Sequence, residues 1–213
     1  MPYDAQASVT DQVHASVRSS FHNLRPSEAP ESAQDAYLDL LILHSPLPTM
    51  AQTLEAWSAL ETYVPHRIRN LGISNCTLPI LKELYPLVKV KPAVVQNRFY
   101  GDTQFDVPLR SFCRDNHIIY QSFWTLTANP ELIRSDAVQS LARHVGISPA
   151  ASLYCLVLGL GGTTLLNGTT KRAHMEADLV APKKVEQFSH EHPDMWERIM
   201  GSFQHLTGDH VDL

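Results

Sequence analysis

The sequence contains few cysteines, and they do not form a recognisable framework. Only three of the 213 residues are cysteine, namely Cys76, Cys113 and Cys155, and no Cys-x-x-Cys spacing occurs. An odd number of scattered cysteines is typical of reduced thiols in an intracellular protein, because disulfide frameworks need pairs. We therefore expect three buried thiols that serve packing, and a cytoplasmic location.

The sequence also lacks an excess of basic residues and a long apolar run. It has 17 Lys and Arg against 22 Asp and Glu, whereas a nucleic-acid surface needs clustered positive charge. The longest apolar run, residues 151–166, is shorter than the ~20 residues that cross a bilayer, and Gly161-Gly162 divides it. The first ten residues show no basic start and no apolar core of a signal peptide. We predict a protein that contacts neither nucleic acid nor membrane and acts on a small molecule.

What the sequence does contain is an alternation of short apolar runs with helical spacings. Parallel strands joined by crossover helices are expected from this order, with near-continuous apolar strands because helices cover both faces. Ser8 and Asp11 have the spacing of a capping box at the start of the first helix. The expected strands are residues 38–43, 68–74, 93–96, 118–124 and 163–167. The expected helices are residues 9–24, 49–64, 77–88, 107–116, 137–145, 151–159 and 171–179.

Polar and aromatic side chains follow these strands where each one ends. Because the carboxyl ends of parallel strands carry the functional groups of such folds, we expect a small-molecule pocket there. His44 is the sharpest candidate, since an imidazole serves as acid or base near neutral pH. His190 and His192 lack companions at metal-ligand spacing, and no metal site is expected. The strand ends carry His44, then Ser74-Asn75, Gln96-Asn97-Arg98, Phe123-Trp124 and Asn167-Gly168-Thr169.

Three segments in a fixed order resemble a known family. YLDLLILHSP, then IRNLGISN, then KPAVVQNRFY, followed by a Gly-Thr-Thr loop, resemble the aldo-keto reductases and especially their fungal members. The resemblance runs from about Val9 to Asp178, about four fifths of the chain. It implies a (β/α)8 barrel that binds NADP(H) across its C-terminal face. In that family a tyrosine protonates the substrate oxygen, a lysine and an aspartate tune the tyrosine, and a histidine orients the carbonyl.

The resemblance assigns roles to individual residues. His44 matches the family histidine, and we take it as the catalytic residue. Ser74, Asn75 and Gln96 match residues that hold the nicotinamide carboxamide, and Phe123 falls where an aromatic ring stacks on the nicotinamide. The substrate contacts predicted at the same rim are Asn75, Gln96, Arg98, Phe123 and Trp124. The cofactor contacts are Ser74, Asn75, Gln96 and Phe123, joined by Thr169 and Thr170 at the start of the last expected helix, where backbone amides attract an anion.

The chain departs from the family pattern in two places. The resemblance begins at the family's third helix, so the strands that carry the tyrosine, lysine and aspartate have no counterpart in these residues. Loss of a general acid costs ~10²–10⁴-fold in rate, or roughly 3–5 kcal/mol. Gly168 and His174 stand where the family has the lysine and arginine that grip the 2′-phosphate of NADP. We therefore expect no resident cofactor, with NADP(H) as the alternative. Tyr37, Tyr100 and Tyr120 are candidates for a substitute acid, but nothing in the sequence places any of them beside His44.

These expectations combine into one architecture. The fold class is α/β: an incomplete TIM-type (β/α) barrel of about five parallel strands with surrounding helices and a C-terminal helical extension. We predict a single domain over residues 1–213, with the partial barrel at 8–180 and a helical tail at 183–213. The strand that precedes His44 and the strand that ends at Asn167 would lie at the sheet edges, and exposed edges invite pairing. We expect a homodimer, or a gap covered by the N-terminal segment and C-terminal helix.

Three functions remain open on the sequence. The first is a redox-neutral enzyme of fungal secondary metabolism, an isomerase, cyclase or dehydratase with His44 as acid or base. The second is an NADP(H)-dependent carbonyl oxidoreductase completed by oligomerisation. The third is a non-catalytic interaction protein.

Overall fold

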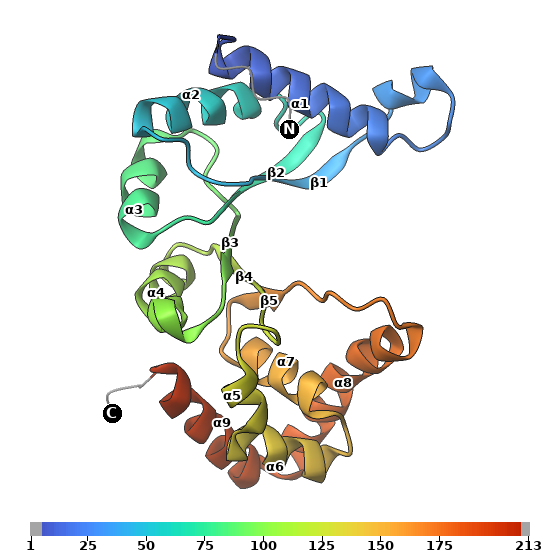
Figure 1. Cartoon of the computed structure of the whole chain (residues 1–213), viewed down its shortest axis with the longest axis vertical. Coiled ribbons are helices and arrows are strands. Elements are labelled where there is room, and N and C mark those ends of the chain that lie inside the picture. Colours follow the sequence, from blue (N-terminus) through green and yellow to red (C-terminus); the bar gives the residue numbers. More distant parts are fainter. Residues whose placement is uncertain (1–5, 210–213) are drawn as a thin grey trace. The chain divides into compact units, whose positions relative to one another are not determined.

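The chain forms two compact units around parallel β-structure (Figure 1). The computed structural model describes residues 6–209, and the units comprise residues 1–96 and 97–213. Five strands follow one another in the order β1-β2-β3-β4-β5, with β1 and β5 outermost. The register is parallel between β1 and β2, between β2 and β3, and between β4 and β5. The predicted α/β fold of five parallel strands, with those two at the edges, is confirmed.

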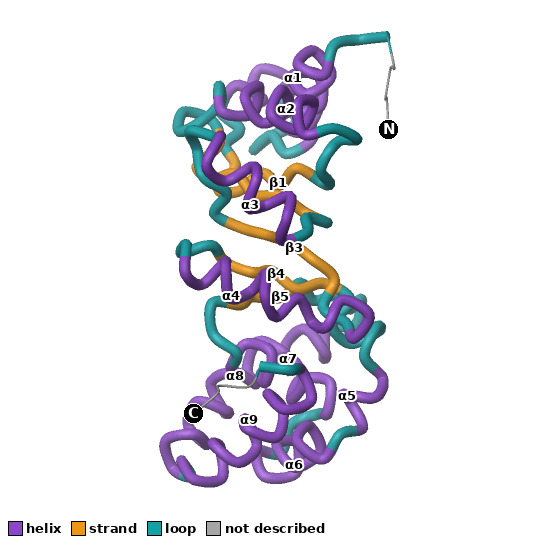
Figure 2. Tube along the Cα trace, turned by 90° about the vertical axis from the view of Figure 1, so that its left-hand side faces the viewer, coloured by secondary structure: helices purple, strands orange, loops and turns teal. Residues whose placement is uncertain are grey.

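Unit 1 consists of three strand segments and the helices that precede and join them. Figure 2 shows α1 and α2 on one side of β1 and β2. The elements are α1 (Val9–Asn23), η1 (Pro30–Gln34), β1 (Leu38–Leu43), α2 (Met50–Glu61), β2 (Ile68–Ser74), α3 (Leu78–Leu87) and β3 (Val94–Arg98), whose last two residues belong to unit 2.

Local sequence signals set the ends of these elements. Ser8 is the N-cap of α1, because its hydroxyl accepts a hydrogen bond from the backbone N–H of Asp11, as the capping box predicts. Strand β1 was expected to be buried on both faces, and this is wrong. None of its residues is fully buried, and Asp39 is exposed. The physical reason is its position at the edge of the sheet, where one neighbour is absent from the residues described.

The core of unit 1 lies between β2 and the helices. Trp57 of α2 is fully buried and its indole N–H donates a 2.9 Å hydrogen bond to the backbone carbonyl of Val90. Gly72 of β2 pairs with Ile42 on one side and Val94 on the other. A Cβ at Gly72 would lie 2.9 Å from the carbonyl oxygen of Val94, so only glycine lets these backbones approach so closely.

Unit 2 adds two strands and a group of helices to the end of β3. The elements are η2 (Gly101–Asp106), α4 (Val107–Asp115), β4 (Ile119–Phe123), α5 (Pro130–Arg134), α6 (Asp136–Val145), α7 (Pro149–Gly159), β5 (Thr163–Leu165), α8 (Arg172–Glu191) and α9 (Pro193–Thr207). Short η2 and α5 were not expected from the sequence.

The C-terminal helices differ in one respect from the expectation. Helix α8 runs through Pro182 and Lys183, where the expected tail begins, without a break. A proline inside a helix removes one hydrogen bond, but Ala181, Val185 and Phe188 are buried and hold the helix against the unit. Helix α9 packs through one apolar face, since Ile199, Met200 and Phe203 are buried.

A buried ion pair fixes the end of α9 to α4. Arg110 is 1% exposed, and its two Nη atoms donate hydrogen bonds of 2.8 and 2.7 Å to the carboxylate of Asp209. Its Nε donates to the backbone carbonyl of Phe105 at 2.8 Å. Every nitrogen of this guanidinium therefore has a partner, as a buried arginine requires.

The described residues, 6–209, contain no disulfide, no cluster of metal ligands and no single helix fit to span a membrane. The three cysteines are free and buried. No group of three or more His, Cys, Asp or Glu side chains in this range has a metal-binding arrangement. No one helix in it has the length and apolar character needed to span a membrane, and α6 with α7, bent by 107°, meets those criteria only as a pair.

Candidate functional site

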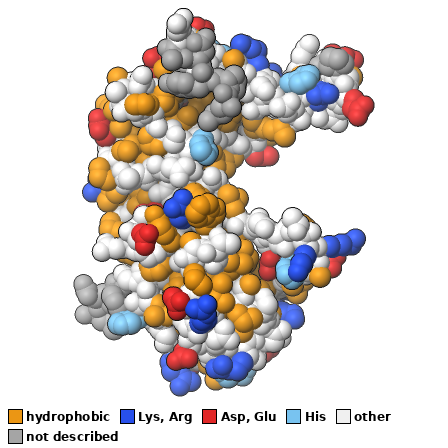
Figure 3. Space-filling view, viewed as in Figure 1, with side chains coloured by type: hydrophobic (Ala, Val, Ile, Leu, Met, Phe, Trp, Pro, Cys, Tyr) orange, Lys and Arg blue, Asp and Glu red, His pale blue; other side chains and the backbone are white. Residues whose placement is uncertain are grey.

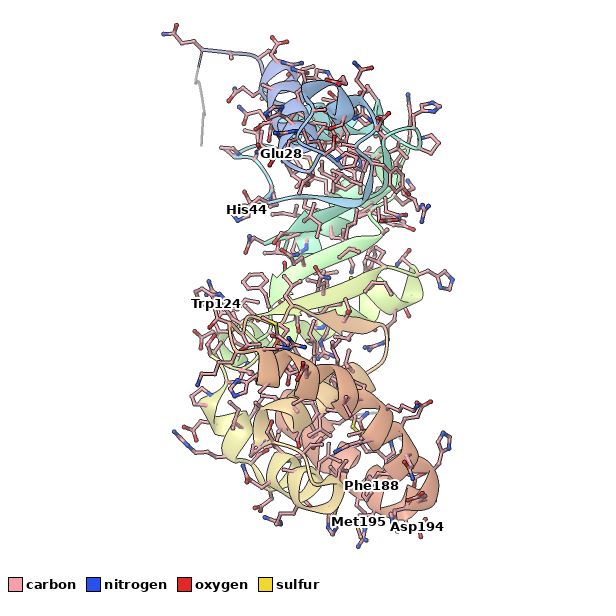
Figure 4. All side chains as sticks on the ribbon, turned by 90° about the vertical axis from the view of Figure 1, so that its right-hand side faces the viewer. Glu28, His44, Trp124, Phe188, Asp194 and Met195 are labelled. Atoms are coloured by element: carbon pink, nitrogen blue, oxygen red, sulfur yellow. The ribbon has the colours of Figure 1, made fainter. Side chains whose placement is uncertain are left out.

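His44 follows the last residue of β1 directly, and Asn75 follows the last residue of β2. The side-chain amide of Asn75 donates a 2.8 Å hydrogen bond to the backbone carbonyl of His44. Asn75 has a left-handed backbone, with φ at 52°, which asparagine tolerates better than most residues. The imidazole of His44 is exposed and projects away from the ribbon (Figure 4). One strand end thus holds the backbone of the other and leaves the imidazole at the rim.

Ser74 and Gln96 extend this arrangement to β3. The Ser74 side chain is buried, and its hydroxyl donates a 2.7 Å hydrogen bond to the backbone carbonyl of Gln96. The side-chain oxygen of Gln96 lies 3.3 Å from the same hydroxyl, and Asn75 Nδ2 also lies 3.3 Å from it. The backbone N–H of Asn75 donates to the Gln96 carbonyl at 3.1 Å. A continuous hydrogen-bonded chain therefore joins His44, Asn75, Ser74 and Gln96 across three strand ends of unit 1.

This series of hydrogen-bonded groups has the chemistry of a recognition site for an uncharged ligand. Asn75 directs its two amide hydrogens to His44 and Ser74, which orients its carbonyl oxygen as an acceptor. Amide and hydroxyl groups fixed in this way suit a ligand that carries a carbonyl or a carboxamide. The four residues that the sequence predicted for this rim are thus brought together, and whether they bind a ligand stays a prediction.

The predicted residues of unit 2 form a second cluster. Arg98 ends β3, and its guanidinium carbon lies 4.1 Å from the ring centroid of Trp124 and 5.0 Å from that of Tyr100. Phe123 meets Trp124 edge to face, with centroids 6.2 Å apart. The backbone N–H of Phe99 donates to the carbonyl of Phe123 at 3.2 Å, which joins the ends of β3 and β4. The structure therefore gathers Arg98, Phe123 and Trp124 as one aromatic and cationic group.

Tyr100, one of the three candidates for a substitute acid, is also a member of this cluster. It was considered as a substitute proton donor, but its ring lies against Arg98. Residues two apart on an extended chain share one face, and Tyr100 has extended backbone angles. The spacing of Arg98 and Tyr100 was the signal that would have found this contact.

The loop after β5 holds Thr169 and Thr170. The side-chain oxygen of Asn167 accepts a 3.1 Å hydrogen bond from the backbone N–H of Thr169, and Asn167 also bonds the carboxylate of Asp178. Thr169 in turn accepts from the backbone N–H of Lys171 at 3.2 Å. Thr170 is exposed and no side chain caps α8. The loop is thus ordered by its own contacts, and its role in anion binding stays a prediction.

The structure argues against the other two candidates for the replacement acid, Tyr37 and Tyr120. Tyr37 precedes β1, whereas His44 follows it, so the strand separates them by roughly 20 Å. The Tyr120 hydroxyl donates a 3.0 Å hydrogen bond to Asp106. Burial, and then the negative charge of Asp106, raise the pKa of Tyr120, so its proton is held more tightly than in water.

Asn97 and Asp106 were not recognised as structural residues from the sequence. Asn97 was grouped with the rim residues, but its side chain is buried and donates a 2.9 Å hydrogen bond to Asp106. Asp106 therefore accepts from both Asn97 and Tyr120 inside unit 2. No sequence signal marked the contacts among Asn97, Asp106 and Tyr120, because the three residues come from separate elements.

The chain is similar in sequence and in fold to known reductases. The chain is 29% identical over 129 residues to 2,5-diketo-D-gluconic acid reductase B of Corynebacterium sp., covering 60% of this chain and 46% of that one. It is 33% identical over 96 residues to the NAD/NADP-dependent indole-3-acetaldehyde reductase of Schizosaccharomyces pombe, covering 43% and 34%. The crystal structure of an aldo/keto reductase from Brucella melitensis superposes with a TM-score of 0.65 at 19% identity, covering 80% and 61%. The chain is homologous to the aldo-keto reductases.

Homology to aldo-keto reductases fits the parallel strands, which correspond to part of a barrel. No protein-family model matches the sequence. The chain spans about half the length, or less, of the two curated reductases named above. The likeness to fungal aldo-keto reductases in particular stays a prediction.

Proposed function

We propose that this chain carries the carbonyl-orienting and nicotinamide-holding residues of an aldo-keto-reductase-type enzyme. The observation that carries the proposal is the hydrogen-bonded chain from His44 through Asn75 and Ser74 to Gln96. It lies at the carboxyl ends of parallel strands, where folds of this class place their chemistry. Two relatives, the 2,5-diketo-D-gluconic acid reductase and the NAD/NADP-dependent indole-3-acetaldehyde reductase, support carbonyl reduction as the reaction.

The residues present fit one end of a nicotinamide dinucleotide. A carboxamide needs an acceptor for its N–H groups, and the oriented oxygen of Asn75 supplies one. In unit 2, Arg172 at the start of α8 is a basic residue that could join Thr169 and Thr170 in an anion contact, and it pairs with Glu176 at 2.7 Å. Exposed pairs of this kind are weak and exchange readily with another anion. Ser74, Asn75 and Gln96 would therefore hold the carboxamide, and an anion contact at Thr169 and Thr170 of unit 2 is a separate prediction.

Each side chain then has a distinct task in the reaction. Reduction of a carbonyl adds one hydride to carbon and one proton to oxygen, and the nicotinamide supplies the hydride when bound. The exposed imidazole of His44 donates a hydrogen bond to the carbonyl oxygen, and in its protonated form it can deliver the proton. Asn75 fixes the backbone of His44 and thereby sets where the imidazole points.

The proposal is tested by titrating the protein with NADPH and following the fluorescence of the bound nucleotide. Asn75→Ala should weaken binding by roughly tenfold, because the loss removes two hydrogen bonds that orient the rim. Asn70→Ala is the matched control. Asn70 also lies on β2 and also donates its amide to a β1 carbonyl, that of Asp39, at 3.0 Å. Absence of NADPH binding to the wild-type chain at millimolar concentration would refute the proposal.

A second candidate is a redox-neutral acid–base reaction at His44, such as an isomerisation, cyclisation or dehydration. The observation that favours it is that Tyr120 donates to Asp106 and Tyr37 lies at the opposite end of β1 from His44. A reaction that moves only protons needs an imidazole and a polarising amide. Turnover of a carbonyl substrate by nucleotide-free protein, lost in both His44→Ala and His44→Gln, would support it. Unchanged turnover in those variants would remove His44 from the mechanism.

A further inference from the structure

We propose that Arg98 binds the carboxylate group of a small-molecule ligand. This inference goes beyond the proposed function, because it assigns an anion site to unit 2 that does not depend on the residues of unit 1. It concerns residues of unit 2 alone. The supporting observations are the contacts of the Arg98 guanidinium, its lack of a described partner, and a comparison with two other arginines.

The guanidinium of Arg98 is positioned by aromatic rings. Its central carbon lies 4.1 Å from the centroid of Trp124 and 5.0 Å from that of Tyr100, both within the range of a cation–π contact. Trp124 has a left-handed backbone, with φ at 56°, which places a bulky residue in an unfavourable conformation. Its ring is nevertheless 56% exposed. The stack therefore forms at the surface of the unit instead of closing a core.

Arg98 lacks the hydrogen bonds that an arginine in a structural role makes. Its Nε is buried and has no partner among residues 6–209. None of the four ion pairs in the described residues involves Arg98; these are Arg69–Asp39, Arg110–Asp209, Arg134–Glu131 and Arg172–Glu176. A buried donor without a partner costs free energy, and the protein itself does not satisfy this guanidinium as it satisfies a structural arginine. Arg25 Nε is also unpartnered, but its Nη1 donates to the carbonyl of His22.

Two other arginines of the chain show what a satisfied guanidinium looks like. Arg67 also lies over a ring, 4.0 Å from the centroid of Phe21, but its Nε and Nη2 donate to the backbone carbonyls of Ala36 and Ala33. Arg110 satisfies all three nitrogens. Ring contact alone is therefore not the distinguishing feature of Arg98. The difference is that its donors are held in place and unpaired.

The ligand that matches such a group is a planar anion. A guanidinium presents a flat fork of N–H donors that pairs with the two oxygens of a carboxylate, and stacking on aromatic rings reduces the entropy lost when the pair forms. The exposed face of Trp124 offers an apolar surface for the rest of the molecule. The class inferred is thus a small molecule with a carboxylate and an apolar or aromatic body.

The test compares an acid with its uncharged amide by calorimetric titration of the full chain. Phenylglyoxylate, an aromatic 2-oxo acid, should bind the wild-type protein more tightly than phenylglyoxylamide. Arg98→Gln should lose about 10- to 100-fold in affinity for the acid and leave the amide unchanged. Arg98→Lys, which keeps the charge without the fork, should fall in between. Arg69→Gln is the control, because Arg69 also lies over a ring, that of Tyr37 at 5.3 Å, but pairs with Asp39.

Several outcomes would overturn the inference. These are equal binding of acid and amide by the wild type, no binding of the acid, or an equal loss of both probes in Arg98→Gln. A loss of NADPH affinity with acid binding retained would assign Arg98 to the nucleotide instead. Circular dichroism establishes that each variant is folded. If Arg98→Gln does not fold, Arg98→Lys replaces it in the comparison of acid and amide. Arg98-dependent acid binding without NADPH binding would refute the proposed function and leave the anion site standing.

Discussion

The side-chain amide of Asn75 is bonded to the main-chain carbonyl of His44 at 2.8 Å, although 31 residues separate them in the sequence. The contact exists because both residues follow parallel neighbouring strands, and Leu43 is paired with Ile73 in the register. The left-handed backbone of Asn75 turns its amide toward β1. The face of the molecule drawn in Figure 3 mixes hydrophobic and charged side chains.

The backbone at Asn75 can be separated from its side chain by substitution. Asn75→Gly keeps the left-handed conformation, whereas Asn75→Val forces a β-branched residue into it and should cost about 1–2 kcal/mol more in the free energy of unfolding. Urea denaturation measures the difference. At Asn70, in the middle of β2, the order should reverse, because valine favours a strand and glycine weakens it. The same order at both positions would contradict the assigned backbone geometry.

The Arg110–Asp209 pair should dominate the stability of unit 2. The side chains are 1% and 9% exposed, and removing one partner leaves the other charged and buried. Arg110→Met or Asp209→Leu should each lower the free energy of unfolding by about 3–5 kcal/mol, and the double variant should lose less than the sum. For comparison, Arg134→Ala, which breaks the exposed pair with Glu131, should cost about 1 kcal/mol or less. Equal effects at the two sites would count against the buried pair.

The thiol of Cys155 should make stability depend on alkaline pH. Burial, and then the negative charge of Asp178, raise the pKa of Cys155 to about 12, above the ~8.5 of a cysteine in an unfolded chain. The folded state therefore favours the neutral thiol, a contribution that is complete below pH ~8.5 and is lost as the pH rises toward 12. The free energy of unfolding should fall over that interval, and less steeply in Cys155→Ala. An identical pH profile in the variant would exclude this thiol as the cause.

Gly72 should tolerate no side chain. Alanine there would place its Cβ 2.9 Å from the carbonyl oxygen of Val94 and 3.1 Å from a side-chain carbon of Ile42. Thermal unfolding of Gly72→Ala should show a loss of about 1–3 kcal/mol through overpacking. Gly168→Ala provides the control, because a Cβ at that position would have no neighbouring atom within 4 Å. Stability equal to wild type in Gly72→Ala would mean that β2 and β3 can move apart.

The sequence alone determined the order of the five strands and the bounds of the first two, whereas the bounds of β3, β4 and β5 differ from the expected ones by one or two residues at an end. Apolar runs bounded by proline and polar residues predicted β1 and β2 to the residue, because a strand needs only local β propensity and a place to end. The same order placed His44, Ser74, Asn75 and Gln96 at strand ends, and the structure joins them by hydrogen bonds. Parallel topology makes this possible, since it brings every carboxyl end to one side of the sheet.

Tertiary structure alone decided which polar residues serve packing and which remain unpaired. Nothing local distinguishes Arg98 from Arg110, yet one is left with an unsatisfied Nε and the other meets Asp209, 99 residues away. The continuation of α8 through Pro182 likewise depends on burial of Phe188 and its neighbours against the rest of the unit. Hydrogen-bond satisfaction and burial depend on what lies nearby in space, and separation along the chain does not encode that.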